Sequence, residues 1–195
     1  MIVVFHYWGT CCCCCDGTNL LFGHTSLYCT NGKFGVAGGH TDIVIQNKPK
    51  DNEIAADPFD TYLKVEQRYG KIIGMAAIPS AEDGKRSNDS ESQIESPFSL
   101  SEEKIFSWAK TSREDLDCAD VVYKALKRAG AEYLGVPDRA LWRTLHTPGN
   151  ALLYAKAIAQ KCGLMDRITE EKYKAMCRSA GFYDEARSTH MYEAI

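Results

Sequence analysis

The segment LDCADVVYKALKRAG, residues 116–130, carries the signals of a complete helix. Asp117 is a good N-cap, and Gly130 supplies the left-handed residue at which helices commonly end. The residues that share one face of this helix are small or apolar: Cys118, Val122, Ala125 and Ala129. That face is expected to pack on a sheet, with Cys118 in the first helical turn.

The position of Cys118 favours nucleophilic chemistry. Unpaired N–H groups and the positive end of the dipole at a helix N-terminus lower the pKa of a thiol and favour the thiolate. The neighbouring Asp117 acts in the opposite direction, because a negative charge raises a thiol pKa. A buried cysteine on an apolar helix face is also commonly a small hydrophobic residue, so the helix alone leaves both interpretations open.

Upstream of this helix the chain reads as β-strands. Four stretches rich in β-branched, aromatic or alternating residues predict strands: 2–8 (IVVFHYW), 24–29, 34–36 and 70–78. The Asn-Gly pair at 31–32 accepts the positive φ angles of a tight turn, and so predicts a hairpin. After a bulge at 37–39, residues 40–46 are expected to continue the second arm of that hairpin.

Downstream of residue 100 the pattern is helical. We expect helices at 101–110, 118–129, 150–162 and 169–179, with Thr169 opening the last. The polar stretch of about 80–100 has no period and predicts a mobile surface loop. Strands followed by helices give an α+β fold, an antiparallel sheet packed against the cysteine-bearing helix with additional C-terminal helices. The length of 195 residues suits one domain spanning 1–195.

Composition excludes several classes of function. The net charge of −3 and the pI near 6.0 give no basic field for a phosphate backbone, so nucleic-acid binding is disfavoured. No apolar run approaches the ~20 residues of a membrane-spanning helix. The first residues lack a basic region and a small-residue cleavage site, so we expect synthesis in the cytoplasm and, if the protein is exported, export without a cleaved signal peptide.

The nine cysteines suggest free thiols rather than a disulfide framework. Five are adjacent at 11–15 and the others are scattered, as in a reducing compartment: Cys29, Cys118, Cys162 and Cys177. Zinc ligands are spaced so that the chain can wrap the ion, so consecutive cysteines are poor ligands. We therefore expect no metal and no cofactor. Residues 11–15 are interpreted as a small-residue loop, with metal binding and lipidation of these thiols as the two less favoured interpretations.

A candidate partner for the thiol begins the 24–29 strand. His24 directly follows Gly23, at a position where a helix N-terminus can approach the sheet closely. Its imidazole could take the proton of Cys118 and return it to a leaving group. The alternative is a structural histidine whose hydrogen bonds are satisfied in the core.

The two segments together resemble the permuted papain-like families. Gly-His-Thr-Ser-Leu-Tyr at 23–28, followed much later by Asp-Cys-Ala and the apolar helix at 117–130, is similar to permuted NlpC-type peptidases and amidases, to lecithin:retinol acyltransferase-like enzymes and to bacterial effector domains that acylate lysines. The stretches 58–70 and 147–159 are similar to the effector-like branch. The resemblance touches most of residues 1–162, and it implies a permuted papain-like fold.

Carried over residue by residue, the resemblance implies Cys118 as the nucleophile and His24 as the general base. The family usually has Asn before the cysteine, where this chain has Asp117. The residue that orients the histidine commonly lies about twelve positions after it, where this chain has Val36, which cannot serve. If the bulge shifts the register, His40 comes into reach, and it is our prediction for this role. The other candidates are Asp42 and Asp60.

The resemblance implies acyl transfer through a thioester. Our first hypothesis is a cysteine hydrolase, an amidase or endopeptidase that cleaves peptidoglycan peptides as a secreted bacterial effector or toxin of the type VI kind, with an immunity protein or a secretion-system carrier as a partner. The second is an acyltransferase or lipase acting on lysine or lipid, with residues 1–8 and Tyr28 lining an apolar tunnel. The third is a non-catalytic binding domain that keeps the fold but lacks the orienting residue.

Overall fold

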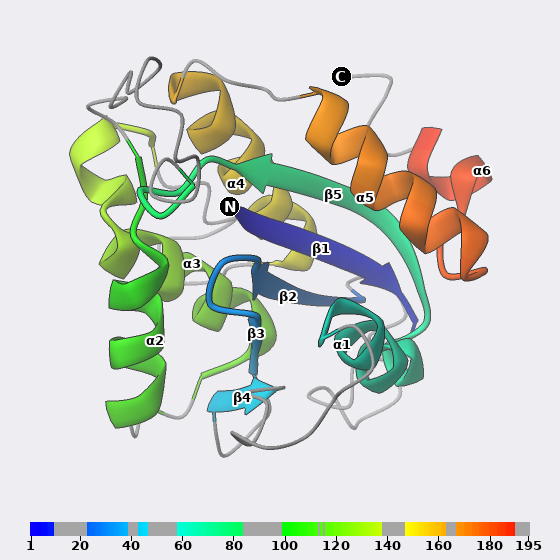
Figure 1. The fold of residues 1–195 in the computed structure, drawn as a ribbon, viewed down its shortest axis with the longest axis horizontal. Coiled ribbons are helices and arrows are strands. Elements are labelled where there is room, and N and C mark those ends of the chain that lie inside the picture. Colours follow the sequence, from blue (N-terminus) through cyan, green and yellow to red (C-terminus); the bar gives the residue numbers. More distant parts are fainter. Residues whose placement is uncertain are drawn as a thin grey trace.

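The computed structural model describes residues 1–9, 23–38, 43–46, 58–83, 99–112, 114, 116–137, 147–162 and 167–189. Within these residues the chain forms one antiparallel sheet of five strands in the order β4-β3-β2-β1-β5 (Figure 1). The strands are β1 (Ile2–Trp8), β2 (His24–Cys29), β3 (Phe34–Gly38), β4 (Ile43–Gln46) and β5 (Lys71–Ile78). The sheet and the helices around it confirm the α+β class.

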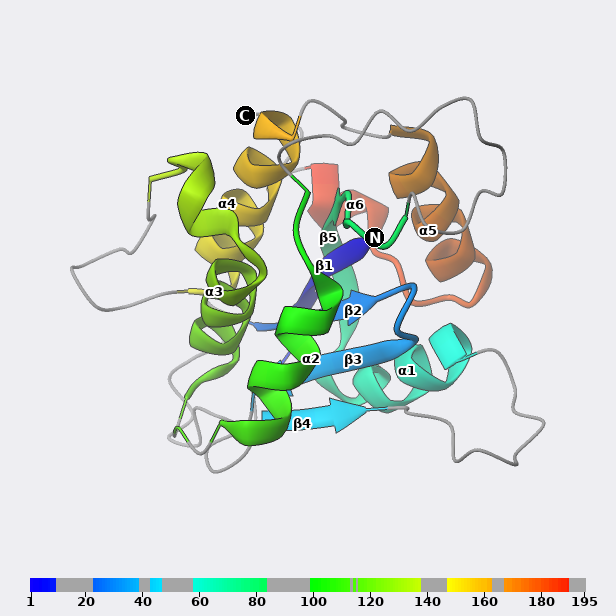
Figure 2. The same cartoon turned by 60° about the vertical axis from the view of Figure 1, so that its left-hand side comes forward.

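Helices cover both faces of the sheet (Figure 2). One face carries α2 (Glu102–Thr111), α3 (Cys118–Ala129) and α4 (Pro148–Lys161). The other carries α1 (Pro58–Glu66), α5 (Arg167–Ser179) and the short α6 (Glu185–Ser188). Two short 3-10 helices, η1 (Gln67–Tyr69) and η2 (Ala131–Leu134), follow α1 and α3.

Alternation along β1 explains why both faces are apolar. Ile2 and Val4 point to the layer of α3 and α4, whereas Val3, Phe5 and Tyr7 point to the layer of α1 and α5. All five are at most 1% exposed. A strand that is buried on both faces reads as a continuous hydrophobic run, which is how residues 2–8 look in the sequence.

Most of the predicted elements are confirmed, with one correction. Asn31-Gly32 turns the chain between β2 and β3 as expected. Residues 43–46, however, do not continue the arm formed by β3, because β4 pairs antiparallel with β3 and the chain has therefore reversed between them. The glycines at 38–39 are compatible with a bulge or with a reversal, so the sequence alone does not choose. Residues 84–98 of the predicted polar loop lie outside the described residues, and its two ends pair at Ser80 and Leu100.

Candidate functional site

The start of α3 presents Cys118 as the sequence predicts. Asp117 is the N-cap, and its Oδ1 accepts a hydrogen bond of 2.8 Å from the backbone N–H of Asp120. Gly130 closes the helix with φ of 118°. Cys118 is the first residue of the helix and is 4% exposed. The thiol is therefore held in the first turn, where backbone N–H groups of a helix lack intrahelical acceptors.

The direction of α3 determines which end of the sheet the thiol approaches. The carbonyl of Ala129, at the end of α3, accepts a hydrogen bond of 3.0 Å from the N–H of Ser101. The next residue, Glu102, lies 2.5 Å from the amino group of Met1, where β1 begins. Since α3 packs across β2 and β3 and is about 18 Å long, Cys118 at its other end lies about one helix length away from the end of the sheet at which β1 begins.

His24 is the first residue of β2, but its side chain points to the face of the sheet opposite α3. It is paired in register with Tyr7, whose side chain packs in the layer of α1. The His24 Nε2 lies 3.2 Å from Glu66 Oε2 at the end of α1, and its ring stacks on Tyr69 with centroids 3.8 Å apart. His24 and Glu66 are both 0% exposed. The structure therefore does not bring His24 to the face on which α3 packs.

A buried polar network continues from His24 along the same face. The hydroxyls of Ser26 and Tyr62 are hydrogen-bonded, and Tyr7 lies 3.4 Å from Ser26 and 3.5 Å from Tyr62. Burial raises the pKa of Tyr7 and of Tyr62 well above the usual range of a phenol, and the charge of Glu66 acts in the same direction. These hydroxyls stay protonated at neutral pH and bind one another, so the network ties α1 to β1 and β2.

A second histidine, which the sequence analysis did not single out, lies on the face of α3 and α4. His6 follows Ile2 and Val4 in alternation along β1, and it is paired in register with Thr25 of β2. It is 3% exposed. A Cβ added to Gly23 would lie 3.1 Å from His6 Nε2, so the ring lies against the glycine. The alternation Ile-x-Val-x-His at 2–6 is the signal that could have indicated this position.

The residues considered for orienting the imidazole of His24 lie in different places. Two of them lie outside the described residues: His40 and Asp42. Val36 is buried in the apolar layer beneath α3, as expected for a residue that cannot orient a histidine. Asp60 is exposed on α1. The acid that contacts the ring of His24 is Glu66, one turn and a half further along that helix, which the sequence analysis missed.

Three other described cysteines are buried, and their surroundings disfavour the thiolate. Burial raises the pKa of Cys29 well above its usual value, that of Cys162 to about 11 and that of Cys177 to about 12. All three are free thiols. They provide an internal reference for the reactivity of Cys118 within one folded molecule.

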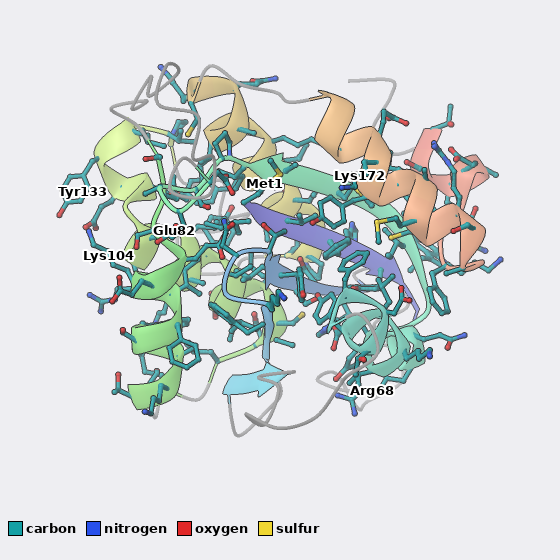
Figure 3. All side chains as sticks on the ribbon, viewed as in Figure 1. Met1, Arg68, Glu82, Lys104, Tyr133 and Lys172 are labelled. Carbon is teal, nitrogen blue, oxygen red and sulfur yellow. The ribbon has the colours of Figure 1, made fainter. Side chains whose placement is uncertain are left out.

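A cleft of about 350 Å³ lies at the far end of the sheet from Cys118. Its walls include Phe34, Phe106 and the carboxylates of Glu82 and Glu102. Glu82 accepts hydrogen bonds from the backbone N–H groups at the start of α2, and Glu102 accepts them from the N–H groups of residues 31–32. Figure 3 shows Met1 and Glu82 at this end and Arg68 at the other. Glu102 thus stabilises the β2–β3 turn, and Glu82 stabilises the start of α2.

The described residues contain no group of three or more His, Cys, Asp or Glu side chains arranged to hold a metal ion. Among the same residues, no helix has both the length and the apolar character needed to cross a bilayer. Comparisons with protein-family models, with curated proteins and with solved structures find no match to this chain.

Proposed function

We propose that this chain is a cysteine-dependent hydrolase that cleaves amide bonds, with Cys118 as its nucleophile and a permuted papain-like arrangement of helix and sheet. The observation that carries the proposal is the position of Cys118. It is the first residue of α3 and is capped by Asp117, and α3 packs on the face of the sheet to which His6 of β1 points by alternation. A thiol with helix N–H groups on one side and an imidazole within the same layer is the arrangement that nucleophilic catalysis requires.

The chemistry proceeds in two balanced steps. The sulfur of Cys118 bonds to the carbonyl carbon of an amide, the C–N bond breaks, and the amine leaves with the proton that the thiol gave up. Water then attacks the thioester, which releases the carboxylic acid and restores the thiol. The N–H of Asp120 is bound to Asp117, so the donors that we assign to the oxyanion are the N–H groups of Cys118 and Ala119.

We propose peptide bonds of peptidoglycan as the substrate, with the chain acting as a secreted bacterial effector. The support is the resemblance of its two motifs to permuted NlpC-type enzymes. An acyltransferase acting on lysine or lipid would need an acyl tunnel, and the expected lining residue Tyr28 instead packs against Phe59 and Tyr62 with centroids 5.2 and 5.0 Å apart. That packing favours the hydrolase.

The test compares activity of the wild type with Cys118→Ala. Purified peptidoglycan is incubated with each protein, and soluble fragments are identified by intact mass. We expect fragments from the wild type, none from Cys118→Ala, and undiminished release from Cys162→Ala, which removes a buried thiol on α4. Consumption of an acyl-CoA without peptidoglycan fragments would replace the hydrolase with the acyltransferase. No turnover in either assay would contradict both enzymatic functions and favour the third hypothesis, a non-catalytic binding domain.

A further inference from the structure

We infer that His6, not His24, is the general base that serves Cys118, and that His24 is a structural residue of the opposite face. The inference rests on the proposed cysteine chemistry and names a second catalytic residue for it. It follows from the alternation of side chains along two paired strands and from the contacts that His24 makes on the opposite face.

The alternation of side chains along β1 and β2 places the two histidines on opposite faces of the sheet. In the β1–β2 pair, Tyr7 is opposite His24 and His6 is opposite Thr25. Side chains of directly paired residues share a face, and neighbouring residues on one strand point to opposite faces. Because Tyr7 packs with α1, His24 points to α1 as well, and His6 points to the layer of α3 and α4.

The position of His6 along β1 places it on the face that α3 and α4 cover. Ile2 and Val4 precede it on the same face and belong to the core beneath these helices, where α4 contacts β1 and β2 and α3 contacts β2 and β3. His6 continues this row toward the end of β1. Its neighbours across the sheet are small, Gly74 on β5 and Thr25 on β2. Small flanking residues leave room for an imidazole under two helices, where a large pair would fill the space.

Gly23, the residue before His24, contributes to the position of His6. Gly23 has φ of 64°, and a Cβ there would lie 3.1 Å from His6 Nε2. The absent side chain therefore makes space for the ring of His6. The two residues of the Gly-His pair therefore act on different faces of the sheet. Gly23 leaves space for the ring of His6 on one face, and the side chain of His24 lies on the other.

His24 is already committed to the layer of α1. Its Nε2 lies 3.2 Å from Glu66 Oε2, its ring stacks on Tyr69, and the side chains of His24 and Glu66 are completely buried. Turning His24 toward α3 would break this contact and leave the carboxylate of Glu66 buried beside the space it vacated, which is strongly unfavourable. His6 needs no such rearrangement to face the helix layer.

In the reaction, the imidazole of His6 takes the proton from the sulfur of Cys118 and gives it to the leaving nitrogen as the C–N bond breaks. In the second step it takes a proton from the attacking water, and this proton returns to the sulfur when the thioester breaks. The imidazole is regenerated in its neutral form, so the cycle balances.

The test measures alkylation of individual cysteines by iodoacetamide between pH 5 and 9, with labelled peptides mapped by mass. Cys162 and Cys177 are the internal references. In the wild type, we expect Cys118 to react much faster than both references at pH 6. In His6→Gln we expect its rate at pH 6 to fall on the order of tenfold or more, as thiolate formation returns to the pH range of an isolated thiol.

The matched variant is His24→Gln, for which we expect the pH profile of Cys118 to keep its shape. The reverse pattern, loss in His24→Gln and retention in His6→Gln, would overturn the inference. A Cys118 that reacts no faster than Cys162 in the wild type would instead overturn the proposed function, so the two failures are distinguishable. Circular dichroism of each variant establishes that it is folded.

A second measurement needs no histidine variant. The imidazole resonances of the folded wild type and of Cys118→Ala are titrated by NMR. We expect the apparent pKa of His6 to fall in Cys118→Ala, because the thiolate that stabilised its charged form is gone, and that of His24 to stay unchanged. A shift confined to His24 would contradict the assignment.

Discussion

At the scale of single residues, Gly23 is a position that tolerates substitution poorly. It has φ of 64°, and a Cβ would lie 2.1 Å from the carbonyl oxygen of Tyr7. We expect Gly23→Ala to lower the free energy of unfolding by about 2–4 kcal/mol, since a steric clash with backbone adds to the cost of the left-handed conformation. Urea unfolding followed by circular dichroism measures the change.

Gly135 provides the control for that substitution. Its φ of 63° is nearly the same, but a Cβ there would have nothing within 4 Å. Gly135→Ala is expected to cost only about 1–2 kcal/mol, the conformational part alone. If Gly23→Ala and Gly135→Ala lower the free energy of unfolding equally, the close approach of Gly23 to β1 does not contribute to the cost of the substitution.

The residue scale also shows where sequence-based prediction stops. The N-cap Asp117 and the C-terminal Gly130 could be predicted because capping is local chemistry. The direction of His24 could not, because the face to which a strand residue points depends on register, and a shift of one residue reverses every side chain. A sequence gives the alternation of β1 but not which of its two apolar sets lies under α3.

At the scale of elements, the buried contact of His24 with Glu66 ties α1 to β2. Removing one member of a buried pair leaves the other without compensation. We expect Glu66→Ala to lower the free energy of unfolding by about 3–5 kcal/mol. In a double-mutant cycle, adding His24→Ala should cost less than it does in the wild type. Urea unfolding of the four proteins gives the coupling energy.

Lys64→Ala is the matched control on the same helix, since Lys64 is exposed and two residues from Glu66. It should change the free energy of unfolding by less than about 0.5 kcal/mol. If Glu66→Ala behaves like Lys64→Ala, or if the cycle gives no coupling, the buried contact does not stabilise the junction of α1 and β2.

The same junction shows which elements could be predicted. The helix at 118–129 has caps at both ends and a clear apolar face, and it was predicted with the bounds observed. The helix α1 was not predicted, although Pro58 at its first position is a helix-start signal. It is only nine residues long, and its helical state depends on burying Phe59, Tyr62 and Leu63 against the sheet, which is tertiary information.

At the scale of the whole molecule, one sheet separates two apolar layers with different contents. The layer of α3 and α4 is mostly aliphatic and small, with Tyr123 stacked on Tyr154, and Cys118 begins its helix α3. The layer of α1 and α5 is aromatic, and it buries hydroxyls, a histidine and a carboxylate. A nucleophile needs access to substrate at the edge of its layer, whereas the polar groups of the aromatic layer contact one another and stabilise the scaffold.

Buried thiols and phenols on both sides of the sheet make stability fall at alkaline pH. The pKa values of Cys177, Cys162, Tyr7 and Tyr62 are raised in the folded protein by burial. In the unfolded chain these groups ionise at about pH 8.5 for Cys and about pH 10 for Tyr. Between those values and the raised ones, the unfolded state binds fewer protons, so the free energy of unfolding decreases as pH rises.

The contribution of Cys177 can be isolated from this alkaline loss. With a folded pKa of about 12, its stabilising effect is complete below about pH 8 and is lost as pH rises toward that value. Cys177→Ala should lower stability at pH 7 by leaving a small cavity. Above pH 9 it should also make the decline with pH shallower, by at most about 1.4 kcal/mol per pH unit. Urea unfolding at pH 7, 9, 10 and 11 compares the slopes, and parallel curves for variant and wild type would show that this thiol ionises equally in both states.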